Sequence, residues 1–133
     1  MARTQRSRFA FAQSGAAAVE YAVILPVFLV LVLGIMDTGR LLWAYTTLNN
    51  ATEAAARCYA INAPSCTTSA AVQTYAVTQA WGLTISASAF AATTQTCGAQ
   101  VSASYVFTFV IPWFSVVGNS NSMTLTAVAC YPS

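Results

Sequence analysis

The stretch Gly15–Tyr21 reads GAAAVEY and stands directly before an apolar run that continues to Met36. Glu20 is the one charged residue between Gly15 and Met36. A helix needs about 20 apolar residues to cross a bilayer, so this segment is long enough to span one. A carboxylate inside such a segment costs about 2.5–3.5 kcal/mol on insertion scales and usually has a function and a partner. We therefore expect a membrane-held helix in which Glu20 has a specific task.

The residues before this stretch carry only positive charge, at Arg3, Arg6 and Arg8. Positively charged flanks stay on the cytoplasmic side of a membrane, so the helix is expected to run outward from the cytoplasm. We expect residues 1–15 to form a leader and residues 16–57 a long helix that spans the membrane over residues 16–36. Residues 58–133 are then expected to form a domain outside the membrane.

The leader allows two interpretations. Cleavage between Gly15 and Ala16 would place a free amine one helical turn from Glu20, or opposite the Glu20 of a neighbouring copy. Without cleavage, residues 1–36 would be a plain signal anchor, and the protein would be a single-pass binding or scaffold module of the cell envelope. An ordinary secretory signal fits less well, because its apolar core spans about 7–15 residues and is followed by a small-residue cleavage site.

The second half of the chain predicts a small α+β domain. Apolar residues at helical spacing predict a short helix over residues 69–81, ended by Gly82. Alternating apolar and polar residues predict three strands, at residues 83–89, 101–111 and 123–127. The expected fold is a long N-terminal helix, a short helix and a three- or four-stranded antiparallel sheet.

The cysteines lie at Cys58, Cys66, Cys97 and Cys130. An even number in a small exported domain indicates disulfides, for which three pairings exist. If the last two predicted strands are antiparallel neighbours, Cys97 lies near Cys130 and Cys58 is left to pair with Cys66. The alternative is a zinc site, which is disfavoured because the chain has no histidine and no closely spaced cysteine pair. We expect no metal and no cofactor.

The few charged residues argue against two classes of function, nucleic-acid binding and acid–base catalysis. The chain has five Lys and Arg residues, three Asp and Glu residues and no His. No basic patch exists to bind nucleic acid through its phosphates. Acid–base catalysis would need Glu20, Asp37 or Glu53, and the first two are expected near opposite faces of the membrane. We therefore expect neither a nucleic-acid-binding protein nor an enzyme.

An apolar loop at residues 111–118 contains Trp113 and Phe114. These two side chains are either a contact surface for lipid, a partner subunit or another surface, or they fold back over the sheet and complete its core. No residue beyond Arg57 is charged, so the surface of the domain is expected to be rich in Ser, Thr, Asn and Gln. Such a surface is compatible with a glycan ligand.

Gly15, Glu20 and Tyr21 before an apolar helix resemble the prepilin peptidase motif of Flp/Tad-type pilins. With the Leu25-Pro26 pair and the Asp37…Arg40 spacing, the likeness extends to the TadE/TadG-like pseudopilins. It covers about residues 10–57 strongly and the rest of the chain only in outline.

This resemblance implies a minor pilin of a Tad-type pilus, which is type IVb-like, with a type IV pilin-like fold. A prepilin peptidase would cut between Gly15 and Ala16 while the subunit waits in the bacterial inner membrane. Ala16, Glu20 and Tyr21 would then serve assembly, with Glu20 neutralising the Ala16 amine of the adjacent subunit. The implied partners are other pilins, the peptidase and the Tad inner-membrane platform, and the implied role is pilus biogenesis, adhesion or surface attachment. A simpler interpretation is that Glu20 only reflects the preference for an acidic residue at the start of a helix and is solvated at the membrane interface.

Overall fold

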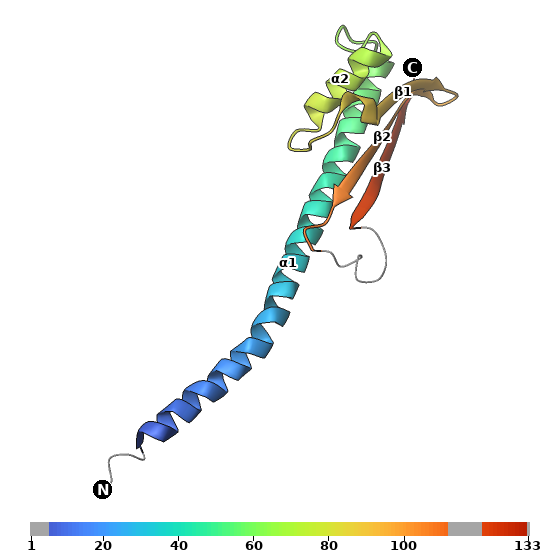
Figure 1. The fold of residues 1–133 in the computed structure, drawn as a ribbon. Helices are drawn as coiled ribbons and strands as arrows, with labels where there is room; N and C mark the ends of the chain where they lie inside the picture. The colour runs from blue at the N-terminus through green and yellow to red at the C-terminus, as the bar shows by residue number, and fades with distance from the viewer. Residues whose placement is uncertain (1–5, 112–120, 133) are drawn as a thin grey trace. The chain divides into compact units, whose positions relative to one another are not determined.

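The computed structural model describes the chain at residues 6–111 and 121–132, with side chains from Ala17 onward and the exposure of Gly15. The elements in chain order are helix α1 (Arg6–Ala60), helix α2 (Ser69–Gln79), the 3-10 turn η1 (Ala87–Ala89) and strands β1 (Phe90–Gln95), β2 (Gly98–Thr108) and β3 (Ser122–Tyr131) (Figure 1). The chain divides into two compact units, one up to Met36 and one from Asp37. The expected α+β class is confirmed.

Helix α1 is longer than expected at both ends. It begins at Arg6 rather than at residue 16, in a segment rich in alanine, the residue with the highest helix propensity. It ends at Ala60, where Asn62 adopts a left-handed φ of 49°. The amide of Asn62 donates to the Tyr59 carbonyl and that of Ala63 to the Cys58 carbonyl. This pattern is a Schellman motif, which satisfies the last carbonyls of the helix.

In the second unit, one face of α1 contributes three alanines and one leucine to the core. Ala44, Leu48, Ala51 and Ala55 recur at spacings of three and four residues and are buried. They belong to one hydrophobic cluster with residues of α2 and the sheet, among them Val72, Ala76, Phe90, Val101, Phe107 and Leu125. Figure 1 shows β2 and β3 running beside the last turns of α1. Alanine on this face lets the helix backbone come close to its neighbours.

The sheet is antiparallel with the order β1-β2-β3. Strands β1 and β2 form a hairpin in which Gln95 pairs with Gly98, and β3 pairs with β2 from Ala99↔Tyr131 to Thr108↔Ser122. Gly98 has a φ of +119°, which favours glycine. A Cβ at this position would also collide with the Tyr131 carbonyl oxygen. The hairpin therefore needs glycine both for its backbone angle and for the close approach of β3.

The strand predicted at residues 83–89 is wrong. Residues 84–86 have no regular structure, η1 follows, and the first strand is Phe90–Gln95. Burial nevertheless alternates along residues 83–89, with the odd-numbered residues half-buried and the even-numbered ones exposed. The alternation predicted which side chains face the core, but none of the described strands pairs with this segment.

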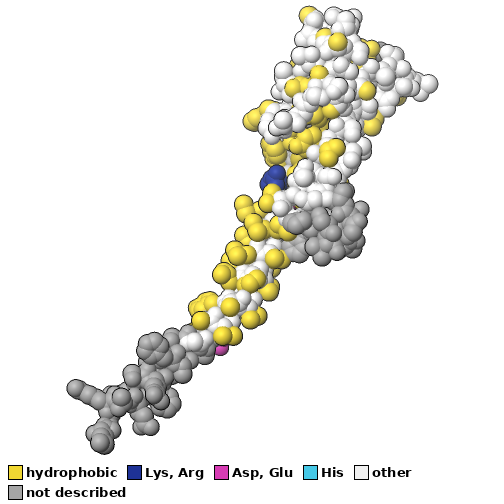
Figure 2. Space-filling view, in the orientation of Figure 1, with side chains coloured by type: hydrophobic (Ala, Val, Ile, Leu, Met, Phe, Trp, Pro, Cys, Tyr) yellow, Lys and Arg dark blue, Asp and Glu magenta, His cyan; other side chains and the backbone are white. Residues whose placement is uncertain are grey.

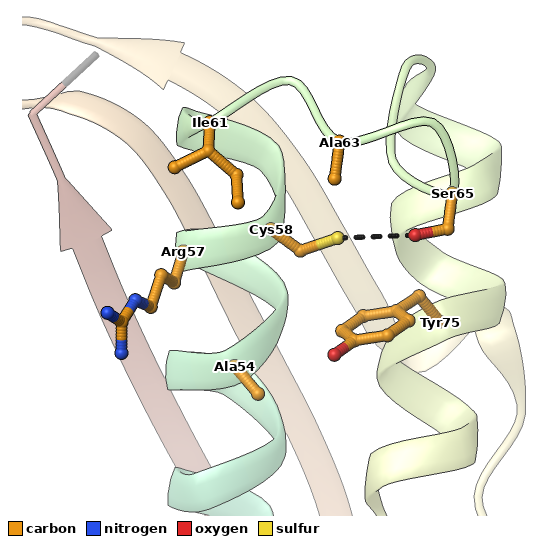
Figure 3. Close-up of a pocket in the computed structure, with 7 residues that line it drawn as sticks. All are labelled: Ala54, Arg57, Cys58, Ile61, Ala63, Ser65 and Tyr75. Atoms are coloured by element: carbon orange, nitrogen blue, oxygen red, sulfur yellow. Dashed lines mark hydrogen bonds between the residues drawn. The ribbon is translucent and has the colours of Figure 1, made fainter.

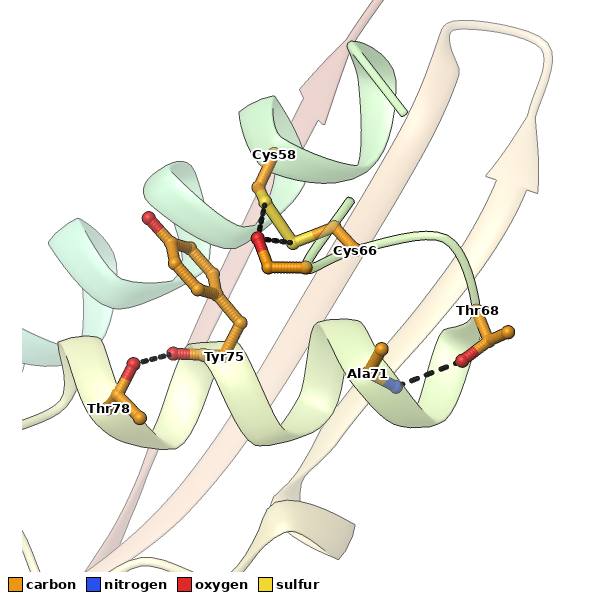
Figure 4. Close-up of a disulfide and its surroundings, with 7 residues drawn as sticks. Cys58, Cys66, Thr68, Ala71, Tyr75 and Thr78 are labelled. Atoms are coloured by element: carbon orange, nitrogen blue, oxygen red, sulfur yellow. Dashed lines mark hydrogen bonds between the residues drawn. A yellow bond between two sulfur atoms is a disulfide. The ribbon is translucent and has the colours of Figure 1, made fainter. Parts of the chain in front are cut away.

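Helix α2 ends two residues before the predicted boundary, at Gln79. At its start, the Thr68 hydroxyl accepts a hydrogen bond of 3.2 Å from the Ala71 amide (Figure 4). This is an ordinary N-cap. Beyond its end, Gly82 turns the chain with a φ of +83°. The Gln73 amide then joins α2 to the sheet by donating to the Phe90 carbonyl at 2.8 Å.

Two disulfides join Cys58 to Cys66 and Cys97 to Cys130, the pairs expected from the strand order. All four cysteines are thereby used, which leaves no thiolate for a zinc ion. The bridges close separations of 8 and 33 residues. The loop-closure model assigns them about 2.5 and about 3.7 kcal/mol of stabilisation.

The two disulfides differ in their access to solvent. Cys58 and Cys66 are buried, and Figure 4 shows their bridge between α1 and the segment leading to α2. Cys97 is exposed in the β1–β2 turn and Cys130 is half-buried.

Because thiol attack requires access to the sulfur, a mild reductant is expected to open Cys97–Cys130 at least about tenfold faster than Cys58–Cys66. Timed alkylation followed by peptide mass spectrometry measures both rates. In the denatured protein the difference should disappear. Earlier alkylation of Cys58 and Cys66 in the native protein would contradict the assigned burial.

Candidate functional site

The first candidate site is the segment near the start of α1 for which the sequence predicts processing and assembly. Gly15, Glu20 and Tyr21 are exposed, and the side chain of Ala16 lies outside the described residues. A Cβ added at Gly15 would meet no described atom within 4 Å, and its φ is not positive. Glycine inside a helix costs about 0.5–1 kcal/mol relative to alanine. Among the described residues, neither sterics nor backbone angle accounts for a glycine at this position.

The helix after this segment exposes many large apolar side chains, and Figure 2 shows them gathered on the visible face. Tyr21 is 72% exposed, Ile24 63% and Val27 67%. The helix is long and apolar enough to cross a membrane, and none of its most apolar stretch is buried. So large an apolar surface calls for apolar surroundings, such as lipid or other apolar helices. Glu20 is the one charge in this surface up to Met36.

The second candidate site surrounds Asp37, at the start of the second unit. Asp37 is buried, with 4% of its surface exposed. Its Oδ2 accepts hydrogen bonds from the backbone amides of Val110 at 2.9 Å and Ile111 at 3.1 Å. Its Oδ1 forms an ion pair with Arg40 Nη1 at 2.9 Å. Three charge-assisted hydrogen bonds thus satisfy the buried carboxylate and join α1 to the segment after β2.

Arg40 extends this cluster to the ring of Phe107. Its guanidinium carbon lies 5.5 Å from the ring centroid of Phe107, within the range of a cation–π contact. Phe107 meets Phe109 edge to face, with centroids 5.2 Å apart. The sequence placed Asp37 near Arg40 but contains no local signal for the bonds to Val110 and Ile111, which lie more than 70 residues away.

The loop residues Trp113 and Phe114 lie outside the described residues, so their predicted contact role stays a prediction. The described part of the second unit does expose two other tryptophans that the sequence interpretation did not single out. Trp81 is 78% exposed and Trp43 is 49% exposed. They border a groove of about 300 Å³, which we call the Trp43–Trp81 groove. It is lined by Trp43, Thr46, Thr47, Asn50, Gln79 and Trp81.

A second groove, of about 440 Å³, lies between α1 and α2 (Figure 3). Its lining includes the Cys58 sulfur, 3.6 Å from the Ser65 hydroxyl, and the ring of Tyr75. In Figure 3 the Arg57 side chain points away from this space. The groove thus combines small and aromatic side chains with no charge directed into it, and we assign it no chemistry.

Comparison with known proteins finds a likeness in the N-terminal part of the chain. Residues 15–57 match the family described as TadE-like protein, which confirms the resemblance over this segment. The matched segment begins at Gly15 and includes Glu20, Asp37 and Arg40. The match concerns this segment, which is less than half of the chain. No curated protein and no solved structure matches the chain.

Proposed function

Because its N-terminal segment matches the TadE-like family, we propose that this protein is a minor pilin or pseudopilin of a Tad-type pilus. A prepilin peptidase cuts it after Gly15, and the subunit then assembles through its N-terminal helix. The match over residues 15–57 is the observation that carries this proposal. Its partners are other pilins, the peptidase and the inner-membrane assembly platform, and its role is pilus biogenesis or surface attachment.

Before assembly, the subunit is held in the inner membrane by the apolar part of α1, with the unit from Asp37 outside. The exposed apolar side chains of the helix and the three arginines before Gly15 support this orientation. Lipid covers these side chains at this stage, and the helices of neighbouring subunits cover them in the fibre.

Gly15 supports cleavage at this position. Glycine has a cost inside a helix, and the described residues give no packing reason for it. A peptidase that must bring its catalytic groups close to the backbone provides a reason. Removal of residues 1–15 would leave the α-amine of Ala16 as a new positive charge, close in sequence to Glu20.

Glu20 then pairs with the Ala16 amine of an adjacent subunit. Inside a helix bundle the effective dielectric constant is low, so an unpaired carboxylate or ammonium group is strongly penalised. Only alignments that bring amine and carboxylate together satisfy both groups. The pair therefore sets the axial register between subunits.

The alternative candidate is an uncleaved, membrane-anchored binding or scaffold module. Helix α1 runs without a break from Arg6 through Gly15, as a signal anchor would. This candidate keeps the three leader arginines and has no dependence on pilus assembly.

Mass spectrometry of the protein from membranes of its native host tests the two candidates. We expect an N-terminal peptide that begins at Ala16, and we expect the Gly15→Val variant to keep residues 1–15 in at least about 90% of molecules, since a branched side chain crowds the cleaved bond. Ser14→Val is the matched control and should still be cut. A wild-type protein that retains Arg3, Arg6 and Arg8 would favour the anchor.

A further inference from the structure

We propose that the Trp43–Trp81 groove is a binding site for neutral saccharides. Its aromatic border is built by two elements of the second unit. Trp43 comes from α1, and a Cβ added at Gly82 would collide with its ring, so the indole packs directly against the Gly82 backbone. Trp81 precedes this glycine in the turn after α2 and is 78% exposed. The glycine thus leaves room for the Trp43 ring against its backbone, while the neighbouring Trp81 ring is open to solvent.

The other residues lining the groove are all uncharged and polar. Within the described part of the chain, the side chains of Asn50, Gln79 and Thr47 form no hydrogen bond. The Thr46 hydroxyl donates to backbone carbonyls of its own helix, which leaves its oxygen able to accept. Amides that both donate and accept therefore stand beside two indole rings, without a charge among them.

This combination matches the chemistry of a pyranose. One face of a sugar ring carries C–H groups that stack on an indole, and its rim carries hydroxyls that both donate and accept hydrogen bonds. Amide and hydroxyl side chains suit such a rim. A volume of about 300 Å³ is at the low end of small-molecule sites, so the groove is suited to one or two rings of a longer chain.

Other ligand classes fit the groove less well. Phosphates, carboxylates and nucleic acids are bound mainly through Arg and Lys, and the groove has neither. A patch for lipid would be continuously apolar, whereas four of the six lining residues are polar. A neutral saccharide uses both the rings and the polar groups.

The proposal deepens the attachment role proposed above, but its test does not depend on pilus assembly. The purified full chain, kept in phosphocholine micelles so that no sugar detergent competes, is titrated with cellohexaose and with chitohexaose. The indole N–H signals in two-dimensional NMR report on each tryptophan. We expect saturable shifts of the Trp43 and Trp81 signals with a Kd of about 1 mM.

The variants separate stacking from general effects. Trp81→Ala is expected to raise the Kd at least about tenfold, while Trp81→Phe keeps an aromatic ring and most of the affinity. Ile61→Ala, at a residue 70% exposed but outside this groove, should leave the Kd unchanged. Asn50→Ala with Gln79→Ala should weaken binding about fivefold, because each removes a partner for the hydroxyls.

Three results would overturn the proposal. One is the absence of a saturable shift with either hexasaccharide at about 20 mM, well above the expected Kd. Another is unchanged binding by Trp81→Ala. The third is that Trp81→Ala lowers pilus incorporation and leaves the titration unchanged, which would assign the groove to a subunit contact. None of these results would test the proposed pilin function. That function is tested separately, by the mass of the N-terminal peptide.

Discussion

Replacing Asp37 with alanine is expected to destabilise the unit that begins at Asp37 by about 3 kcal/mol. The substitution removes the acceptor for the Val110 and Ile111 amides and the partner of Arg40. These hydrogen bonds are part-buried, so amides that lose their partner there regain contact with water only in part and keep some of the cost of having left it. The loss also releases α1 from the segment after β2, so the amides of Val110 and Ile111 should exchange with solvent faster than in the wild type.

Urea unfolding of the full chain in micelles measures the change, and hydrogen exchange locates it. Asp37→Asn should lower the free energy of unfolding less than Asp37→Ala does. Its amide oxygen still accepts hydrogen bonds, although it carries no charge. Glu53→Gln is the matched control, because this acid is exposed on the same helix. The substitution should change the free energy of unfolding by no more than about 0.5 kcal/mol. Arg40→Gln should cost at most about 1 kcal/mol, because the Arg40 side chain is 54% exposed. Equal effects of Asp37→Ala and Glu53→Gln would refute the assigned role.

Replacing Glu20 with alanine is expected to lower incorporation of the subunit into pili at least about tenfold, with membrane insertion unchanged. Leaving one charge of a buried pair without its partner costs about 3–5 kcal/mol, and each 1.4 kcal/mol corresponds to a factor of ten. Insertion should not suffer, because removing a carboxylate from an apolar segment makes transfer to lipid easier. The ratio of pilus-bound to membrane-bound subunit, measured by quantitative immunoblotting, reports the effect.

Three variants sharpen this test. Val19→Ala changes an exposed apolar neighbour and should assemble normally. Glu53→Gln removes an acid of the second unit and should also assemble normally. Glu20→Asp keeps the charge on a shorter side chain and should recover part of the incorporation. Normal incorporation of Glu20→Ala would contradict the pairing mechanism. It would favour the simpler interpretation, in which Glu20 reflects a preference for acidic residues at the start of a helix.

Periodicity in the sequence was enough to predict most elements, because each of them buries one face. Helix α2 and strands β2 and β3 lie within a few residues of their expected positions. Strand β1, in contrast, reads FAATTQ and buries Phe90 while its last three residues are exposed. Its pairing depends on the Gly98 turn and on β2 beside it, so its own residues give a weak strand signal. The segment before it alternates in burial for another reason, which is packing on the core without a partner strand.

The candidate sites also differ in whether the sequence alone could predict them. Gly15, Glu20 and Tyr21 are close in sequence, so their pattern could be seen directly. The bonds of Asp37 depend on where the end of β2 lies in space, and the Trp43–Trp81 groove depends on the turn at Gly82 meeting α1. Such contacts arise from the complete fold and have no local pattern. Attention to tryptophans on the polar face of a helix would have identified Trp43 as a candidate.

Because no residue beyond Arg57 is charged, contacts made by this part of the protein should depend little on salt concentration. Dissolved salt screens attraction and repulsion between exposed charges, with a Debye length of about 10 Å at 0.1 M. The sheet and α2 carry no Asp, Glu, Lys, Arg or His on which this screening could act. Contacts made by this surface with an uncharged partner will therefore keep nearly the same strength between about 0.01 M and 0.15 M salt, the range in which screening changes most.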